Sequence, residues 1–327
     1  MNRRKVISAV AGAAAWPFVA RAQQRAMPLV GFLFQGPRDP TGRRNAADFQ
    51  KGLNKAGWVE GQNVQIEYRW ADNQLDQLPA LAADLVRRNT SLIAAAYSPA
   101  AIAAKAATST IPIVFLSGTD PIRDGLVAAL NRPGGNVTGM AFSNVLLGAK
   151  RLGLLHDLLP AATTFALLFN PTNRLASESY LEATQTASHS LGLQLVVLSA
   201  SSEHEVRNGF ATMVEQRIGG LIVPADASFG SLQDQIVGLA AHHMIPTIYF
   251  QREAVVAGGL TSYGTNFPNA FREVGMYAGR ILKGEKAVDL PVLQSDKFEF
   301  VINLITATTL GLTIPPDVLS IADEVIE

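Results

Sequence analysis

The sequence contains no cysteine in 327 residues. A disulfide, a thiolate nucleophile and a cysteine metal site are therefore excluded, and a chain without thiols can fold in an oxidising compartment without pairing errors. The formal net charge is zero, from 27 basic and 27 acidic side chains, so the basic surface that binds nucleic acid or an anionic membrane is not expected. With 48% hydrophobic and 17% charged residues, the composition is typical of a globular protein, and the length suits two domains.

Catalytic motifs are also lacking. There is no G-x-S-x-G or H-E-x-x-H, and the glycines of GPRDPTGRR, residues 36–44, have the wrong spacing for a phosphate-binding loop. The five histidines fall on or at the start of predicted helices, and no pair of acidic residues has nucleophile or metal spacing. We therefore expect a binding site without catalytic residues, metal or cofactor.

No segment after the N-terminus is long and apolar enough to span a membrane. The N-terminus has the three parts of a secretory signal peptide: basic residues 3–5, an apolar run at 6–16, and an Ala-x-Ala site at 20–22. We expect residues 1–22 to be removed, so that the mature chain starts near Gln23, without a lipid-anchoring cysteine. A transmembrane helix is the weaker alternative, because the apolar run is roughly half a span. The two adjacent arginines fit the twin-arginine route as well as the general secretory (Sec) route.

The sequence does contain an internal repeat. The segment IPIVFLSGTDPIRDGL begins at Ile111, and IPTIYFQREAVVAGGL begins at Ile245. At nearly the same separation, FLFQGP at 32–37 matches LLFNPT at 167–172. We interpret this as two similar lobes of about 120 residues each. The alternative is that βα units converged on similar patterns.

Apolar runs alternate with amphipathic helical stretches in both halves. Examples are the predicted strands 92–97, 113–116 and 221–223, which are apolar on both faces. Strands of this kind belong to parallel sheets covered by helices on both sides. The predicted fold class is therefore α/β, with two doubly wound parallel-sheet lobes joined by hinges.

The same pattern predicts the domain limits. Residues 28–143 would form lobe one, completed by part of the C-terminal tail, and residues 144–264 would form lobe two. Residues 265–327 would provide a helix that crosses back and a tail that packs on the lobes. Short hinges are expected near 141–147 and 262–268.

Polar residues follow many of the predicted strands. Ligands of parallel sheets bind beyond the carboxyl ends of the strands, so two facing lobes would share one cleft. The candidate ligand-binding residues are Phe34, Gln35, Ser98, Gly118, Thr119, Asp120, Asn170, Asp226, Gln251 and Tyr263. Asp226 would pair with a substrate ammonium group. An aromatic wall of the cleft would come from Phe34, Trp70, Tyr97, Tyr249 and Tyr263, and the alternative is that these residues belong to the hydrophobic core. Ser98 and Asp120 also suit helix N-caps, and the two roles are compatible because a helix N-terminus attracts carboxylates.

Several segments resemble a known family. NVQIEYRWADNQLDQLPALAADLVRRN, AAKAATSTIPIVFLSGTDPIRDGLVAALNRPGGNVTG and LTSYGTN are similar to the substrate-binding proteins of ABC transporters, in the family that includes tryptophan- and tyrosine-binding proteins. The likeness covers about 28–327, and RPGGNVTG and GTDP are its most specific parts. It implies the type I periplasmic-binding-protein fold and a periplasmic monomer that closes over a small solute and delivers it to a membrane permease.

The resemblance also implies roles for residues. Hydroxyls of lobe one near Ser98, Thr119 and Asp120 would hold a ligand carboxylate, and Asp226 would hold the amine. The turn AYSPAA, at 96–101, departs from the more glycine-rich turn of many relatives and leaves the solute open between an amino acid and another aromatic or carboxylate compound. Two alternatives remain: a periplasmic sensor subunit with the same fold and an exported enzyme.

Overall fold

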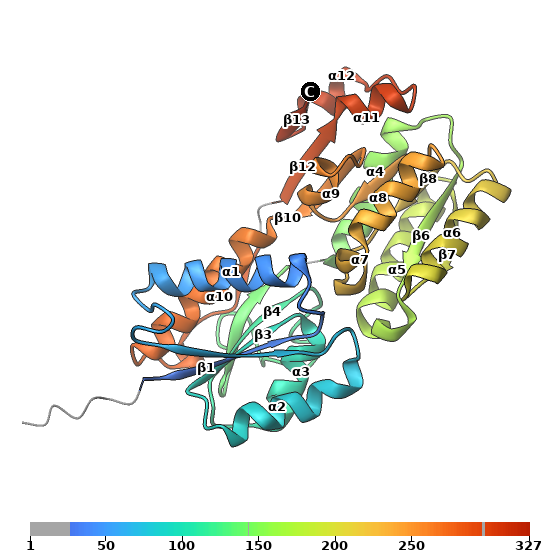
Figure 1. Ribbon diagram of the computed structural model, residues 1–327. Coiled ribbons are helices and arrows are strands. Elements are labelled where there is room, and N and C mark those ends of the chain that lie inside the picture. The colour runs from blue at the N-terminus through green and yellow to red at the C-terminus, as the bar shows by residue number, and fades with distance from the viewer. Residues whose placement is uncertain (1–26, 143, 296–297) are drawn as a thin grey trace, which may run out of the picture.

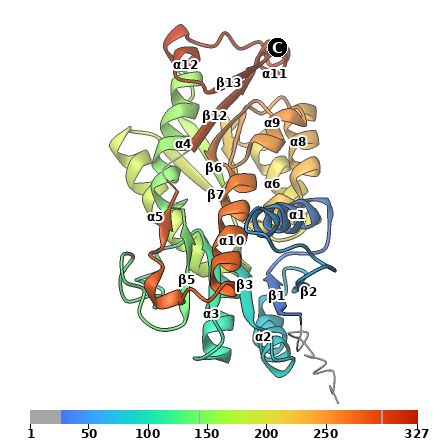
Figure 2. The same cartoon turned by 90° about the vertical axis from the view of Figure 1, so that its left-hand side faces the viewer.

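The computed structural model describes residues 27–142, 144–295 and 298–327 and shows two α/β lobes side by side (Figures 1 and 2). The predicted signal peptide, residues 1–22, lies outside the described residues. No helix within the described ranges is both long and apolar enough to cross a membrane.

Lobe one is built on a six-stranded sheet in which every neighbouring pair is parallel. In spatial order its strands are β11 (Leu293–Gln294), β5 (Val137–Ala141), β4 (Ile113–Ser117), β3 (Leu92–Ala96), β1 (Leu29–Phe34) and β2 (Gln65–Trp70). Its helices are α1 (Pro40–Lys55), α2 (Leu78–Arg87), α3 (Ser98–Ala107) and α10 (Phe267–Leu282). Every residue of β3 and β4 is buried, as expected for central strands with helices on both faces.

Lobe two is built on a seven-stranded sheet. In spatial order its strands are β13 (Glu324–Ile326), β12 (Phe298–Asn303), β10 (Thr261–Thr265), β9 (Thr247–Tyr249), β8 (Gly220–Ile222), β6 (Thr164–Phe169) and β7 (Gln194–Ser199). Only the β10–β12 pair is antiparallel. Its helices are α4 (Asn144–Leu158), α5 (Arg174–Ser190), α6 (Glu203–Glu215), α7 (Ala227–Ser231), α8 (Gln233–His242), α9 (Arg252–Val256), α11 (Leu304–Thr309) and α12 (Pro316–Ser320).

The internal repeat is confirmed by the topology of the two sheets. In lobe one the strands run β5-β4-β3-β1-β2, and in lobe two the corresponding run is β10-β9-β8-β6-β7. The repeated segments at Ile111 and Ile245 lead into β4 and β9, which occupy the same place in their sheets. The equal strand order supports two lobes of the same plan.

The chain passes between the lobes three times. It crosses between β5 and α4, between β10 and α10, and between β11 and β12. The first two crossings fall in the predicted hinge ranges 141–147 and 262–268, whereas the third was not predicted. α10 returns to lobe one and packs closely on α1, since a Cβ added to Gly275 would lie 2.1 Å from the carbonyl oxygen of Phe49.

Some elements differ from the sequence-based expectation. The helix predicted over 230–243 is interrupted at Leu232, which separates α7 from α8. The sequence places His156 on a helix but gives no bounds for α4, where buried leucines such as Leu152, Leu154 and Leu155 lie on more than one side of the helix. Because those leucines do not form a single apolar stripe, the helical period is hidden in the sequence.

A cleft between the two lobes as the candidate binding site

The candidate site lies where the carboxyl ends of strands from both lobes meet. A small cavity there is lined by Phe34, Asn45 and Tyr97 of lobe one and by Asp226, Phe250 and Gln251 of lobe two, among others. Phe34 ends β1 and Tyr97 follows β3, while Asp226 follows β8 and Phe250 follows β9. This is the edge at which parallel sheets bind ligands.

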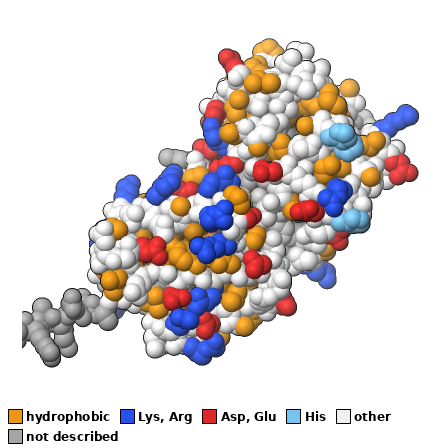
Figure 3. Space-filling view, in the orientation of Figure 1, with side chains coloured by type: hydrophobic (Ala, Val, Ile, Leu, Met, Phe, Trp, Pro, Cys, Tyr) orange, Lys and Arg blue, Asp and Glu red, His pale blue; other side chains and the backbone are white. Residues whose placement is uncertain are grey.

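The cleft is closed. Its cavity measures about 10 Å³, which is room for about one water molecule. The hydroxyl of Thr41 in α1 donates to the carbonyl oxygen of Gly230 in α7 at 3.4 Å, and one cluster of buried hydrophobic residues extends through both lobes. On the face shown in Figure 3 the lobes meet without an open channel. In this arrangement of the lobes the cavity has no room for a molecule larger than water.

Asp226 is the buried carboxylate of this cleft, with 7% of its surface exposed. One of its oxygens accepts hydrogen bonds from Asn170 Nδ2 at 2.8 Å and from the Ser228 backbone N–H at 2.9 Å. The other oxygen accepts from Asn173 Nδ2 at 2.7 Å. Within the described part of the chain no Lys, Arg or His forms an ion pair with Asp226. Three neutral donors fix the carboxylate in place and leave lone pairs for a further donor.

Asp226 is also the N-cap of α7, since its side chain accepts from the backbone of Ser228. Asn170, another candidate, is 1% exposed, and its side chain supports Asp226 rather than facing open space. Sequence reasoning missed Asn173 and Ser228. The signal for Asn173 was its place in the Asn-Pro-Thr-Asn segment after β6, three residues beyond Asn170.

The hydroxyls of lobe one form a closed group. Ser98 Oγ lies 2.8 Å from Ser117 Oγ and 2.7 Å from Thr119 Oγ1, and Ser117 and Thr119 are 3.1 Å apart. Thr119 also donates to the carboxyl group of Asp124. Burial raises the pKa of Asp124, and the Thr119 hydrogen bond acts in the opposite direction. These hydroxyls have internal partners, and a ligand role for Ser98 and Thr119 stays a prediction.

Ser98 is not an N-cap, contrary to one of the two expectations. It is the first residue of α3, and Tyr97 occupies the cap position without a side-chain hydrogen bond. Asp120 is not a helix N-cap either, because residues 121–125 form a turn and no helix: its Oδ1 accepts from the backbone N–H of Ile122 at 2.8 Å and of Arg123 at 3.3 Å within that turn. Asp120 is exposed, and Gly118 beside it is half-buried.

The two glutamines differ in their partners. Gln251 lines the cleft, and its Nε2 donates to Gln233 Oε1 at 2.6 Å. Gln35 is 3% exposed, and its Oε1 has no hydrogen-bond partner among the described residues. A buried acceptor without a donor is rare, so Gln35 is suited to receive an N–H group from outside the chain.

The aromatic residues divide between the cleft and the core. Phe34 lies with its ring centroid 5.3 Å from Trp70 and 5.6 Å from Tyr97, at the cleft. Tyr263 instead packs in lobe two, with its ring 5.9 Å from Phe298 and 6.2 Å from Phe300. Its part in an aromatic wall is therefore wrong, because the alternation along β10 turns its ring toward the core of lobe two.

Tyr249 is likewise a core residue, 2% exposed and away from the cleft cavity. Arg151 of α4, which sequence reasoning missed, is 1% exposed and joins α4 to β10 and α5. Its Nε donates to the carbonyl oxygen of Tyr263 at 2.7 Å and its Nη1 to the hydroxyl of Tyr180 at 2.9 Å. These bonds hold lobe two together directly beside the second crossing.

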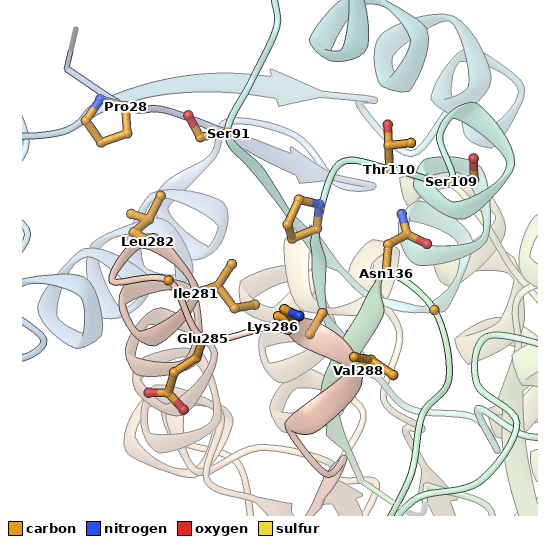
Figure 4. A pocket seen from close by; sticks show the side chains of 14 residues that line it. Pro28, Ser91, Ser109, Thr110, Asn136, Ile281, Leu282, Glu285, Lys286 and Val288 are labelled. Atoms are coloured by element: carbon orange, nitrogen blue, oxygen red, sulfur yellow. The ribbon is translucent and has the colours of Figure 1, made fainter. Parts of the chain in front are cut away.

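A larger cavity of about 550 Å³ lies at the opposite end of lobe one (Figure 4). Its side chains come from the end of α10 and from the loops that enter β3, β4 and β5, including Ser91 and Asn136. None of the candidate residues borders it. Across the described residues no group of three or more His, Asp or Glu side chains could hold a metal ion.

Comparisons with known proteins agree with this architecture. A tyrosine-binding protein of Clostridioides difficile is 30% identical over 264 residues, which cover 81% of this chain and 75% of that protein. A structure of an ABC domain in complex with L-Trp from Streptococcus pneumonia is 26% identical, with a TM-score of 0.80 over 91% of this chain and 99% of that one.

A ligand-free, open structure of a substrate-binding protein with adhesive properties from Clostridium difficile is 27% identical. The match again covers 91% of this chain and 99% of that one, but the TM-score is 0.63. At similar identity and coverage, the lobes of this chain are therefore arranged more as in the complex than as in the open protein. The fold is the type I periplasmic-binding-protein fold. A model of the ABC transporter substrate binding protein family matches residues 40–326, and this chain belongs to that family.

Proposed function

We propose that the chain is an exported receptor that captures an amino acid, or a similar solute with an ammonium group, between its lobes and delivers it to an ABC permease. The observation that carries the proposal is Asp226, a carboxylate buried at the cleft whose hydrogen-bond partners among the described residues are all neutral donors. An isolated buried charge is costly, and a ligand ammonium group would compensate it.

The relatives support the same class of solute. One is named for tyrosine, and another holds L-Trp in its structure. An amino acid would place its ammonium group on Asp226 and present its other groups to lobe one; since a carboxylate only accepts, the buried acceptor Gln35 Oε1 would serve a solute that carries a further N–H or O–H. Contacts with both lobes would favour the closed state over the open one.

The rest of the proposal concerns location and movement. Residues 1–22 would direct export to the periplasm, and residues 28–143 and 144–264 would move as two units about the crossings, with 265–327 packed on them. The protein would act as a monomer and without catalysis, because a receptor needs only to bind, close and dock.

The test begins with the mature protein from Gln23 and a thermal-shift screen of the common amino acids. A ligand that binds only the folded state raises the melting temperature. The best binder is then titrated calorimetrically into wild-type protein and into Asp226→Asn. Loss of a charge-assisted hydrogen bond costs about 1.5–3 kcal/mol, so binding should weaken about 10- to 150-fold.

The Asn variant is chosen because it preserves the local structure. A flip of the Asn173 amide would let it accept from the new amide, while Asn170 and Ser228 keep their acceptor. Asp226→Ala would leave buried donors unpaired, at about 1–3 kcal/mol of stability each, and is the poorer variant. Asp317→Asn, with the same loss of charge at an exposed position of α12, is the matched control. Equal affinities for wild type and Asp226→Asn would refute the proposal.

A further inference from the structure

Tyr97 has a backbone conformation that residues other than glycine rarely adopt. Its φ is 74° and its ψ is 158°, between the end of β3 and the start of α3. This region of φ and ψ is essentially restricted to glycine, and other residues occupy it only when the surroundings hold them there. Such outliers cluster at ligand sites, so the cause of this one matters.

Three aromatic rings surround Tyr97. The ring centroid of Phe34 in β1 is 5.6 Å away, and those of Phe267 and Phe271 in α10 are 6.3 Å and 6.2 Å away. Asn45 of α1 lines the same cavity as the Tyr97 ring. Contacts from β1 and α10 therefore hold the ring from two sides and maintain the unfavourable backbone.

The ring lies in the cleft, opposite the proposed ammonium site. Tyr97 and Asp226 line the same cavity, whose volume of about 10 Å³ is room for about one water molecule. Burial raises the pKa of the Tyr97 hydroxyl, and the carboxylate of Asp226 raises it further. A solute bound to Asp226 must share this space with the Tyr97 ring.

We propose that Tyr97 determines the size of the solute, because its fixed ring occupies the part of the cleft that a large side chain would need. The receptor would then take compact amino acids, such as glycine, alanine or serine, and reject aromatic ones. The lobes would separate only enough to admit the small solute, with the ring kept in place by its partners in lobe one. This inference rests on the proposed function, since it assumes an ammonium group at Asp226.

The test is a calorimetric titration of the mature protein with glycine, L-alanine, L-serine, L-leucine, L-phenylalanine, L-tyrosine and L-tryptophan. Wild type should bind L-alanine at least about tenfold more tightly than L-tryptophan, the discrimination that a pocket boundary provides. Tyr97→Gly and Tyr97→Ala both remove the ring and should reverse this order. Tyr97→Phe keeps the ring, loses only the hydroxyl, and should retain the wild-type order.

Comparing Tyr97→Gly with Tyr97→Ala separates the effect of removing the ring from the effect of relieving the unfavourable backbone conformation. Glycine adopts the observed φ freely, whereas alanine keeps the strain, so Tyr97→Gly should melt at a higher temperature than Tyr97→Ala. Equal melting temperatures would overturn the role given to the backbone. If the small variants do not fold, the order of affinities in wild type and Tyr97→Phe decides the question of size.

Failure of this inference differs from failure of the proposed function. If wild type binds L-tryptophan as tightly as L-alanine, or if Tyr97→Gly keeps the wild-type order, the size inference is wrong and the receptor function stands. If no amino acid binds wild type, either in this panel or in the thermal-shift screen of all the common amino acids, the proposed function is refuted and the size inference is refuted with it.

Discussion

A disulfide across the closed cleft should prevent solute binding. The natural chain has no cysteine, so Thr41→Cys combined with Gly230→Cys introduces the only two thiols. The two positions belong to α1 and α7, in different lobes, and the Thr41 hydroxyl already contacts the Gly230 carbonyl oxygen. A Cβ added to Gly230 would lie 3.8 Å from Cγ2 of Thr41 and no closer than 3.6 Å to any other non-neighbouring atom. The Cβ of Thr41 itself lies more than 4 Å from the added Cβ, near the upper end of the separation of about 3.5–4.5 Å found in disulfides, so the bond forms with a small approach of α1 and α7.

The magnitude follows from the loop that the bond closes. The two positions are 189 residues apart, and the chain-entropy relation gives a stabilisation of about 5 kcal/mol for a loop of that length. A protein of this size has an unfolding entropy of roughly 0.65 kcal/mol per kelvin, so the melting temperature should rise by about 8 °C on oxidation. Reduction with dithiothreitol should remove the whole effect.

Binding should change in the opposite direction from stability. The locked protein keeps a cavity for about one water, so titration with the best binder from the amino-acid screen should show only the unlinked fraction. Reduction should restore wild-type affinity, and the two single cysteine variants should bind normally throughout. If the oxidised double variant binds at full capacity, the closed arrangement does not exclude the solute, and our account of entry is wrong.

Two further predictions concern folding. Gly275→Ala should lower the free energy of unfolding in urea by about 1–3 kcal/mol, because its Cβ would lie 2.1 Å from the Phe49 carbonyl oxygen. Gly153→Ala, with open space around its Cβ, is the control, and equal urea midpoints for the two variants would contradict the close packing of α10 on α1. Asp124→Asn should raise the melting temperature at pH 7. The raised pKa of Asp124 means that its ionised form opposes folding above that pKa, so the gain should vanish below about pH 4, and a gain that grows with acidity would contradict it.

The two-lobed α/β fold was predictable because its strongest signals are local. The runs that became β3 and β4 are apolar on both faces and end at polar turns, which only a covered parallel strand explains. The repeat starting at Ile111 and Ile245 then predicted the equal plan of both lobes. What the sequence did not reveal was the third crossing between β11 and β12, since β11 has only two residues and no periodicity.

The site was harder to predict because its chemistry depends on contacts between distant segments. Asp226 was identifiable as a polar residue after a strand, but its donors Asn170 and Asn173 lie on the loop after another strand. The position of the Tyr263 ring depends on which face of β10 is directed toward the cleft. The sequence of such a short strand does not show which face that is. The backbone of Tyr97 carries no sequence signal, since a tyrosine at positive φ is the opposite of what propensity predicts.

The contrast between the two lobes indicates how binding would proceed. In lobe two, the Asp226 carboxylate is held by three donors of the chain itself, so a solute that binds there loses little to the ordering of its partner. In lobe one, Thr119 already donates to Asp124, within a group of hydroxyls bonded to one another. A solute should therefore bind first to the fixed carboxylate of lobe two, and lobe one should close over it with apolar and amide contacts.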